Sequence, residues 1–118
     1  VAMKLTVVSD ALAAQHYAEH KGKPFYEGLV RFITSAPVIA AVVEGENAVE
    51  LVRATMGATD PKDSDAGTIR GDLAVSIGLN LVHGSDSQES ADREIKLFFS
   101  PDEIVDYTRD IDRWITEA

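Results

Sequence analysis

His83 is the residue in this sequence whose type and neighbours most clearly suggest chemistry. A neutral imidazole has one ring nitrogen with a free lone pair, so it can act as a nucleophile near neutral pH. Gly84 would let the backbone approach a ligand closely or adopt a conformation that other residues avoid. Ser85 adds a hydroxyl beside the imidazole. Because a lone histidine at a strand end is more often structural than catalytic, the interpretation depends on its surroundings.

The segment after His83 predicts an anion-binding helix end and an acid that orients the imidazole. A helix is expected to begin near Asp86, and its first backbone amides would be free to bind an anion. Glu94 lies two turns along that helix, where its carboxylate could reach back to one imidazole nitrogen. Fixing that nitrogen determines that the other one carries the lone pair. Taken alone, Glu94 would more simply be a surface carboxylate.

Two arginines and a threonine flank a polar stretch and could bind phosphate. Arg70 lies between Gly67 and Gly71, where its guanidinium could pair with two phosphate oxygens. Arg53 and Thr59 lie near the other end of the stretch, and each residue alone is more simply a surface residue. The sequence has no glycine-rich loop ending in Lys-Ser or Lys-Thr, so a mechanism based on that loop is excluded.

Two histidines on the first predicted helix have a spacing that could ligate a metal. His16 and His20 have the four-residue spacing that places two side chains on one helix face. No third ligand is evident beside them, so a solvated helix face is the expectation. The acids Asp63 and Asp65 lack the spacing of a calcium-binding helix-loop-helix, and the chain has no cysteine. The sequence therefore predicts no metal site formed by the protein.

The charge balance limits the classes of partner. The 118 residues include 20 acidic and 11 basic ones, for a net charge of −9. Such a chain repels nucleic acid, and its basic residues are scattered singly. The longest apolar run, 38–43, is far too short to span a bilayer. The abundance of Asp and the scarcity of Lys are typical of halophilic proteins, although a plain acidic surface is the simpler interpretation. We expect a cytoplasmic location and no nucleic-acid or membrane partners.

The elements that would position these residues alternate between strands and helices. Strands are expected at 1–8 and 38–43, with short strands at 73–77 and 79–83. Five helices are expected: from Ser9 or Asp10 to about 19, 24–36, 46–57, 86–99 and 100–107. The fourth would begin with a capping box formed by Asp86 and Glu89. Residues 58–72 lack periodicity and predict a long polar loop. This order favours an α+β fold with helices packed on a small, mainly antiparallel sheet.

Four blocks of the sequence resemble the nucleoside diphosphate kinases, in the same order as in that family. The first, Asn80-x-x-His83-Gly84-Ser85-Asp86-Ser87, is similar to the active-site signature of the family. The other three are Gly67 to Asp72, Pro24-Phe25 with Gly28-Leu29-Val30, and Ser100 to Tyr107. The similarity runs through essentially all 118 residues. On these blocks the chain is identified as a member of that family.

The resemblance implies a ping-pong transfer of the γ-phosphate of a nucleoside triphosphate to a nucleoside diphosphate through a phosphohistidine at His83. It also implies a ferredoxin-like α+β sandwich, Mg²⁺ carried by the nucleotide phosphates, and a homo-oligomer, with a hexamer as the expectation. The implied catalytic residues are His83, Glu94, Ser85 and Tyr17. Those implied to bind phosphates and sugar are Arg53, Thr59, Arg70 and Asn80, and those at the base are Phe25, Leu29 and Ile77.

The sequence departs from the family pattern at its beginning. Family members have a strand and a helix before the position of Val1, and that strand supplies a lysine to the phosphates. Residues 1–118 are therefore expected to form a single, N-terminally incomplete domain whose sheet lacks the first family strand. The alternative is a catalytically silent member that serves as a nucleotide-binding or assembly subunit. A further alternative is a ferredoxin-like interaction module with an inert His83.

Overall fold

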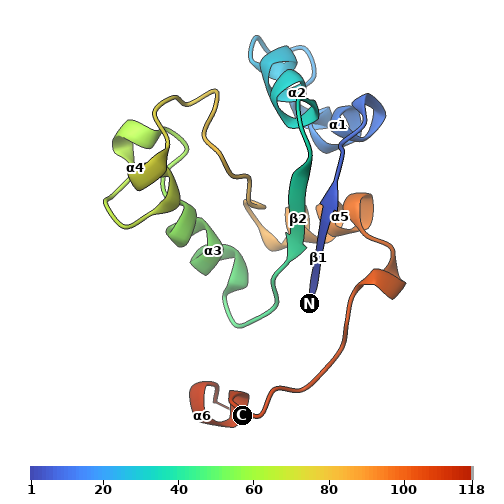
Figure 1. Cartoon of the computed structure of the whole chain (residues 1–118), viewed down its shortest axis with the longest axis vertical. Coiled ribbons are helices and arrows are strands. Elements are labelled where there is room, and N and C mark those ends of the chain that lie inside the picture. The colour runs from blue at the N-terminus through green and yellow to red at the C-terminus, as the bar shows by residue number, and fades with distance from the viewer. Residues whose placement is uncertain (118) are drawn as a thin grey trace.

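A computed structural model describes residues 1–117 as a small antiparallel sheet with helices gathered around it (Figure 1). Strand β1 (Ala2–Thr6) pairs with β2 (Val38–Val42), so that Ala2 lies opposite Val42 and Thr6 opposite Val38. Half-buried and exposed residues alternate along both strands, as expected when one sheet face is covered and the other is open. The strands predicted at 1–8 and 38–43 are thus confirmed, with shorter ladders.

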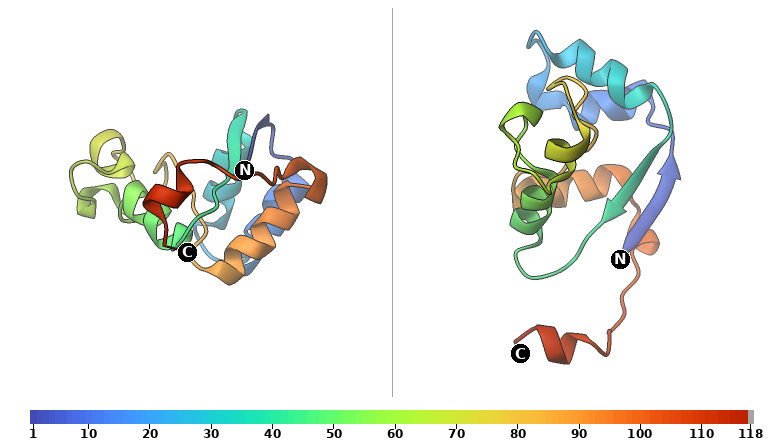
Figure 2. Two further views of the ribbon diagram at one scale, coloured as in Figure 1. Left: turned by 90° about the horizontal axis from the view of Figure 1, so that it is seen from below. Right: turned by 60° about the vertical axis from the view of Figure 1, so that its left-hand side comes forward.

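Two helices follow β1 and lie beyond one end of the sheet (Figure 2). Helix α1 (Asp10–His16) begins at Ser9, whose side chain accepts a hydrogen bond from the Leu12 amide at 3.1 Å. A 3₁₀ turn, η1 (Ala18–His20), extends it, and α2 (Tyr26–Thr34) ends before Pro37 as the sequence predicts. Both helices bury part of their apolar surface against each other, and α1 also packs on α5.

The third helix and the stretch after it form a separate lobe. Helix α3 (Ala48–Met56) ends at Gly57, whose φ of +94° suits glycine and closes the helix as expected. The stretch 58–72 contains a 3₁₀ turn, η2 (Pro61–Asp63), and a short helix, α4 (Ile69–Leu73). The stretch is thus mostly a loop, as predicted, but it contains two short helical turns that the sequence did not indicate. Single turns are too short to show periodicity, and here they are stabilised by side-chain caps from Asp60 and Thr68.

The two short strands predicted at 73–77 and 79–83 are absent from the part of the chain that the structure describes. That segment forms one isolated bridge, between Ser76 and Leu79, and is otherwise irregular. A strand needs a neighbour that satisfies its backbone donors and acceptors, and neither β1 nor β2 pairs with this segment. The Arg70 side chain instead donates hydrogen bonds to the carbonyls of Asn80 and Val82.

Helix α5 (Gln88–Phe98) lies behind the strands in Figure 1 and packs against α1. Its cap is Ser87, which accepts a hydrogen bond from the Ser90 amide at 3.1 Å, rather than Asp86 as predicted. The half-buried sheet face meets the end of this helix, because Lys4 lies 4.7 Å from the centre of the Phe99 ring. The sequence therefore places the helix correctly and misplaces its first turn.

The C-terminal segment begins as predicted and then departs from the prediction. The capping box of Ser100 and Glu103 is present and opens a 3₁₀ turn, η3 (Pro101–Glu103). The helix does not continue to Tyr107, because the chain extends and the Val105 amide donates to the Val1 carbonyl at 2.9 Å. Figures 1 and 2 show the last helix, α6 (Asp112–Ile115), at the end of a tail that leaves the rest of the molecule.

Candidate active site

His83 lies on the irregular segment before α5 and faces the carboxylate of Glu94 from that helix. Its Nε2 atom is 3.3 Å from both carboxylate oxygens. The Ser85 hydroxyl donates to Oε2 of the same carboxylate at 2.5 Å. The His83 side chain is 48% exposed whereas that of Glu94 is 13% exposed, so the imidazole forms the open side of the cluster. The structure thus brings together three of the four predicted catalytic residues through one carboxylate.

The ionisation of Glu94 determines how His83 is held. Burial raises the pKa of Glu94, but hydrogen bonds from His83 and Ser85 outweigh burial and lower it to about 2. The carboxylate is therefore ionised at neutral pH and can only accept hydrogen bonds. A neutral His83 must then carry its proton on Nε2, which leaves the lone pair on Nδ1. The arrangement directs an unprotonated nitrogen away from Glu94.

His16 lies directly behind this pair, which the sequence did not predict. Its ring packs edge-on against that of His83, with centroids 4.6 Å apart, and its Nδ1 is 3.9 Å from Glu94 Oε1. It is only 4% exposed, so the expectation of a solvated helix face is wrong for this residue. The shared i, i+3 and i+4 spacing of Ala13, His16 and Tyr17, all buried, was the available signal.

Burial also governs the charge of His16. Removal from water, followed by the neighbouring imidazole of His83, lowers the pKa of His16 to about 4. The ring is therefore neutral at pH 7. Neither of its nitrogens has a hydrogen-bond partner among the described residues, an uncommon state for a buried polar group.

A row of aromatic rings leads from His83 to the predicted base-binding residues. The Tyr17 ring lies 6.4 Å from that of His83, His20 lies 6.3 Å from Tyr17, and Phe25 lies 5.3 Å from His20. Burial, together with the charge of Glu94, raises the pKa of Tyr17, so its phenol stays protonated. Phe25 is 50% exposed and thus open to a planar ligand, and Leu29 follows one turn later in α2.

Arg70, predicted to face phosphate, is buried beside the segment that carries His83. It is 5% exposed and lies in α4, and its guanidinium donates to three backbone carbonyls. Two of them, those of Asn80 and Val82 at 3.2 and 2.6 Å, lie on either side of Leu81. Leu81 has a φ of +73°, a conformation that costs a non-glycine residue about 1–2 kcal/mol. Arg70 therefore holds a strained residue two positions before His83.

The remaining predicted phosphate-binding residues gather on the same segment. Arg53 donates to the Gly84 carbonyl at 2.9 Å, and the Asn80 side chain donates to the Thr59 carbonyl at 3.1 Å. Together with Arg70, these contacts join α3, α4 and the stretch after α3 to residues 80–84. Ile77 lies outside this hydrogen-bond network, on the segment before Asn80, and is 57% exposed.

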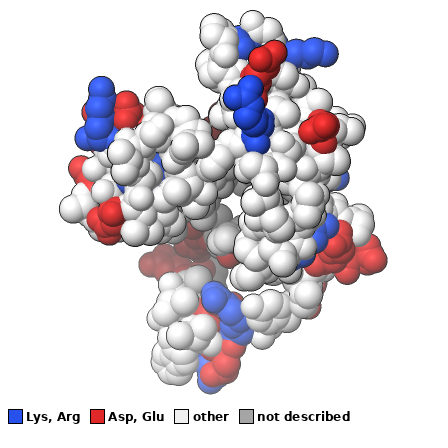
Figure 3. Space-filling model, turned by 45° about the horizontal axis from the view of Figure 1, so that its top comes forward, with Lys and Arg blue, Asp and Glu red and all other residues white. Residues whose placement is uncertain are grey.

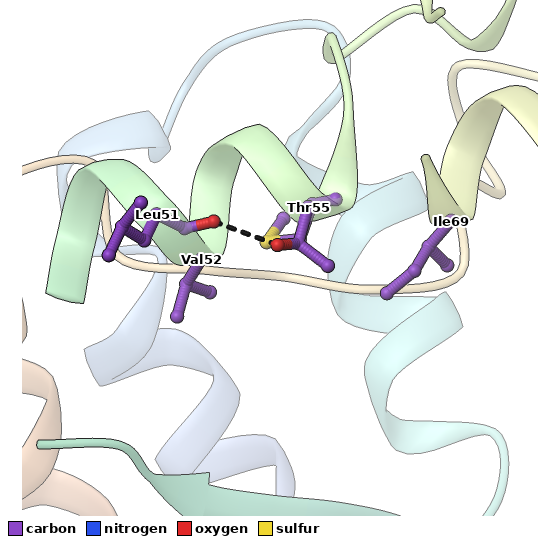
Figure 4. A pocket seen from close by; sticks show the side chains of 5 residues that line it. Leu51, Val52, Thr55 and Ile69 are labelled. Carbon is purple, nitrogen blue, oxygen red and sulfur yellow. Dashed lines mark hydrogen bonds between the residues drawn. The ribbon is translucent and has the colours of Figure 1, made fainter. Parts of the chain in front are cut away.

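Gly84 does not adopt the left-handed conformation that favours glycine, but packing at this position leaves no room for a side chain. A Cβ at this position would lie 2.5 Å from the Met56 sulfur and 3.6 Å from a Val52 methyl group. The close approach is therefore to α3, which lets the segment that carries His83 pack on that helix. A pocket on α3 and α4, lined by Leu51, Val52, Thr55, Met56 and Ile69, is almost wholly apolar (Figure 4). Its lining offers no charged group for a phosphate.

The comparisons with known proteins agree on one family. A family model described as "Nucleoside diphosphate kinase" matches residues 1–104. The chain is 60% identical over 115 residues to the nucleoside diphosphate kinase of Thermomicrobium roseum, covering 98% of this chain and 77% of that protein. It is 55% identical over 117 residues to that of Pelotomaculum thermopropionicum, covering 99% and 78%.

Two solved structures are similar over nearly the whole chain. A halophilic nucleoside diphosphate kinase from Halobacterium salinarum in complex with CDP superposes with a TM-score of 0.95 at 51% identity, over 99% of this chain and 78% of that one. A nucleoside diphosphate kinase family protein from Babesia bovis gives a TM-score of 0.93 at 43% identity, over 98% and 78%. These likenesses confirm the α+β, ferredoxin-like fold.

Proposed function

The chain belongs to the nucleoside diphosphate kinase family, and we propose that it transfers phosphate in two steps through His83. Its activity is that of a nucleotide phosphotransferase. The observation that carries the two-step proposal is the contact of His83 Nε2 with the Glu94 carboxylate at 3.3 Å. That contact leaves Nδ1 with its lone pair on the exposed side of the cluster.

In the first step, the Nδ1 lone pair attacks the γ-phosphorus of a nucleoside triphosphate. A P–N bond forms while the bond from the γ-phosphorus to the bridging oxygen breaks, and the nucleoside diphosphate leaves with that electron pair. The ring becomes positive as the bond forms, and the Glu94 carboxylate stabilises this charge through the Nε2 proton, which stays in place. Ser85 fixes the carboxylate from the other side.

In the second step, a terminal oxygen of another nucleoside diphosphate attacks the same phosphorus. The P–N bond breaks, a triphosphate forms, and Nδ1 regains its lone pair. Because the phosphate waits on the protein, one nucleotide site serves donor and acceptor in turn.

We propose that the phosphates and sugar of the nucleotide are bound by Arg53, Thr59, Arg70 and Asn80. These residues lie on or beside the segment that carries His83. Arg70 uses three of its five N–H donors on carbonyls, and its remaining donors are assigned to the phosphates. Phe25, Leu29 and Ile77 are assigned to the base. The complex of the Halobacterium salinarum relative with CDP supports a nucleotide ligand for this site.

Mg²⁺ is proposed to bind to the nucleotide phosphates. Magnesium prefers oxygen ligands, whereas the ligand cluster found among residues 1–117, His16, His83 and Glu94, offers two imidazoles. When bound to the phosphates, Mg²⁺ would neutralise part of the charge that develops on the departing diphosphate.

We propose that the protein acts as a homo-oligomer, with a hexamer as the expected form. Large apolar side chains are exposed on the outer sheet face and in the tail, among them Met3 at 74%, Leu5 at 70% and Trp114 at 75%. Exposed apolar surface of this kind is typical of an interface between subunits. Light scattering coupled to size-exclusion chromatography would measure the assembly mass, and a monomer at all concentrations would exclude this part of the proposal.

Steady-state kinetics test the two-step proposal. With ATP as donor and GDP as acceptor, reciprocal rate plots at several fixed GDP concentrations should be parallel, because the two substrates never share the site. Intersecting lines would show a direct transfer. A chain that binds nucleotide without turnover would instead be the silent binding or assembly subunit.

A further inference from the structure

His16, His83 and Glu94 form a second arrangement that phosphate transfer does not require. One ligand atom of each residue lies within 4.8 Å of those of the other two, although the residues come from α1, the segment before α5, and α5 itself. The spacing of His16 and His20 on one helix suggested a metal pair with no third ligand. The fold replaces His20 with two ligands that are distant in sequence.

The chemistry of the three donors is that of a zinc site. Two neutral imidazoles and one carboxylate form the ligand set of catalytic zinc sites, in which a fourth position stays open to water. His83 is half exposed and so provides an entry path for a cation, whereas His16 closes the buried side. Hard cations such as Mg²⁺ take oxygen ligands, so this set favours Zn²⁺ or Co²⁺ over Mg²⁺.

The unpartnered nitrogens of His16 are the independent observation that points to a ligand. His16 is 4% exposed, and neither Nδ1 nor Nε2 has a hydrogen-bond partner among the described residues. Its Nδ1 is 3.9 Å from Glu94 Oε1, the oxygen that Ser85 does not occupy. A cation between them would satisfy a buried polar atom and a carboxylate oxygen at once.

The positive charge nearest to this cluster is that of Arg93. Its guanidinium lies 3.9 Å from Glu94 Oε1 and would repel a cation. The side chain is 43% exposed, so water screens its charge, and its other contacts are to the carbonyls of Gln15 and His16.

We propose that His16, His83 and Glu94 bind one Zn²⁺ ion per chain. The ion would bind Nε2 of His83, the ring nitrogen that faces Glu94, so the proton of the neutral ring would lie on Nδ1 instead. Because Nδ1 then lacks its lone pair, the ion would compete with phosphorylation of His83, a consequence that rests on the proposed function. The site is thus an inhibitory one, sensitive to Zn²⁺ and insensitive to Mg²⁺.

Titration of the full chain with Co²⁺ in the absence of nucleotide tests the site itself. We expect the visible absorption of low-coordinate Co²⁺ to saturate at one ion per chain, to be bleached by Zn²⁺, and to withstand excess Mg²⁺. His83→Gln and His16→Gln should each weaken binding more than about 100-fold, because even loss of an outer-shell partner costs 10–100-fold. His20→Gln, on the same segment, is the matched control and should bind as the unaltered chain does.

His83 is exposed, so His83→Gln remains decisive should His16→Gln fail to fold. Unchanged Co²⁺ affinity in a folded His83→Gln chain would overturn the proposal, as would the absence of a saturable signal in the unaltered chain. A chain first phosphorylated with Mg-ATP should lose the Co²⁺ signal. Because the titration needs no nucleotide, a failure of phosphorylation and a failure of metal binding are observed separately.

Discussion

At the scale of single residues, the Glu94 carboxylate organises the site. It accepts from Ser85 and contacts His83, so it fixes both the ring orientation and the position of the proton. The negative charge of Glu94 is as important for the proposed reaction as its position, because the His83 imidazole becomes positive when the P–N bond forms.

Glu94→Gln should therefore slow phosphorylation of His83 by about 100-fold or more, with little change in nucleotide affinity. The amide keeps the size of the carboxylate, but it cannot stabilise the ring charge and can hold either nitrogen. Rapid-quench measurement of phosphohistidine formation gives the rate. Ser85→Ala, which removes one support of the carboxylate, is the control and should show a smaller loss; equal rates in all three proteins would exclude this role for Glu94.

Buried His16 makes stability depend on pH. Its pKa is lowered from 6.5 to about 4 in the folded chain, so the unfolded chain binds more protons between these values. The free energy of unfolding should therefore fall as the pH drops from 6.5 towards 4, by at most about 3 kcal/mol. The lowered pKa of Glu94, about 2, adds a further loss below pH 4.5. Urea titrations across this range measure the slope, and His16→Gln should flatten its upper part; an unchanged slope would contradict the assignment.

The proximity of His83, Ser85 and Glu94 can be predicted from the sequence because these residues lie within 12 positions of one another. Side chains on a helix point back towards its N-terminus, so Glu94 can reach the residues that precede α5. The role of His16 is set by the packing of α1 on α5, a contact between residues far apart in sequence. Sequence spacing carries no direct information on that contact.

At the scale of elements, the segment 80–84 is positioned by helices and not by a sheet. Arg70 binds the carbonyls on both sides of Leu81, Arg53 binds that of Gly84, and Gly84 packs on α3. The helices themselves are predicted from capping residues and apolar spacing, which are local signals. The prediction of strands at 73–77 and 79–83 is wrong because a strand forms only beside a pairing partner, which is distant in sequence. Local residue types do not reveal whether such a partner is present.

Gly84→Ala tests the packing of this segment on α3. The added methyl group meets the Met56 sulfur at 2.5 Å, so the substitution should destabilise the chain by about 1–3 kcal/mol. Met56→Ala should also destabilise it, by leaving a cavity, but should remove the clash. The double variant should therefore be more stable than the sum of the two losses predicts. Strict additivity in denaturant titrations would show that the two residues do not compete for space.

At the scale of the whole molecule, acidic residues outnumber basic ones. The net charge is −9, and on the face shown in Figure 3 acidic and basic side chains form small, separate groups with no broad basic patch. None of the helices in residues 1–117 is long and apolar enough to cross a membrane. The similar structure from Halobacterium salinarum is a halophilic protein.

The stability of the chain should accordingly rise with molar KCl, because salt screens repulsion between the excess carboxylates. Thermal melts in increasing KCl would measure the effect, with sucrose of matched osmolality as a control for preferential exclusion. A melting temperature that does not respond to KCl would exclude the halophile-like interpretation.

Intact-mass spectrometry after incubation with Mg-ATP shows directly whether His83 carries the phosphate. One acid-labile phosphate should be added per chain, GDP should remove it while forming GTP, and His83→Ala should abolish it. A chain that gains no phosphate, or a phosphate that persists in His83→Ala, would contradict the assignment of His83 as the phosphate carrier.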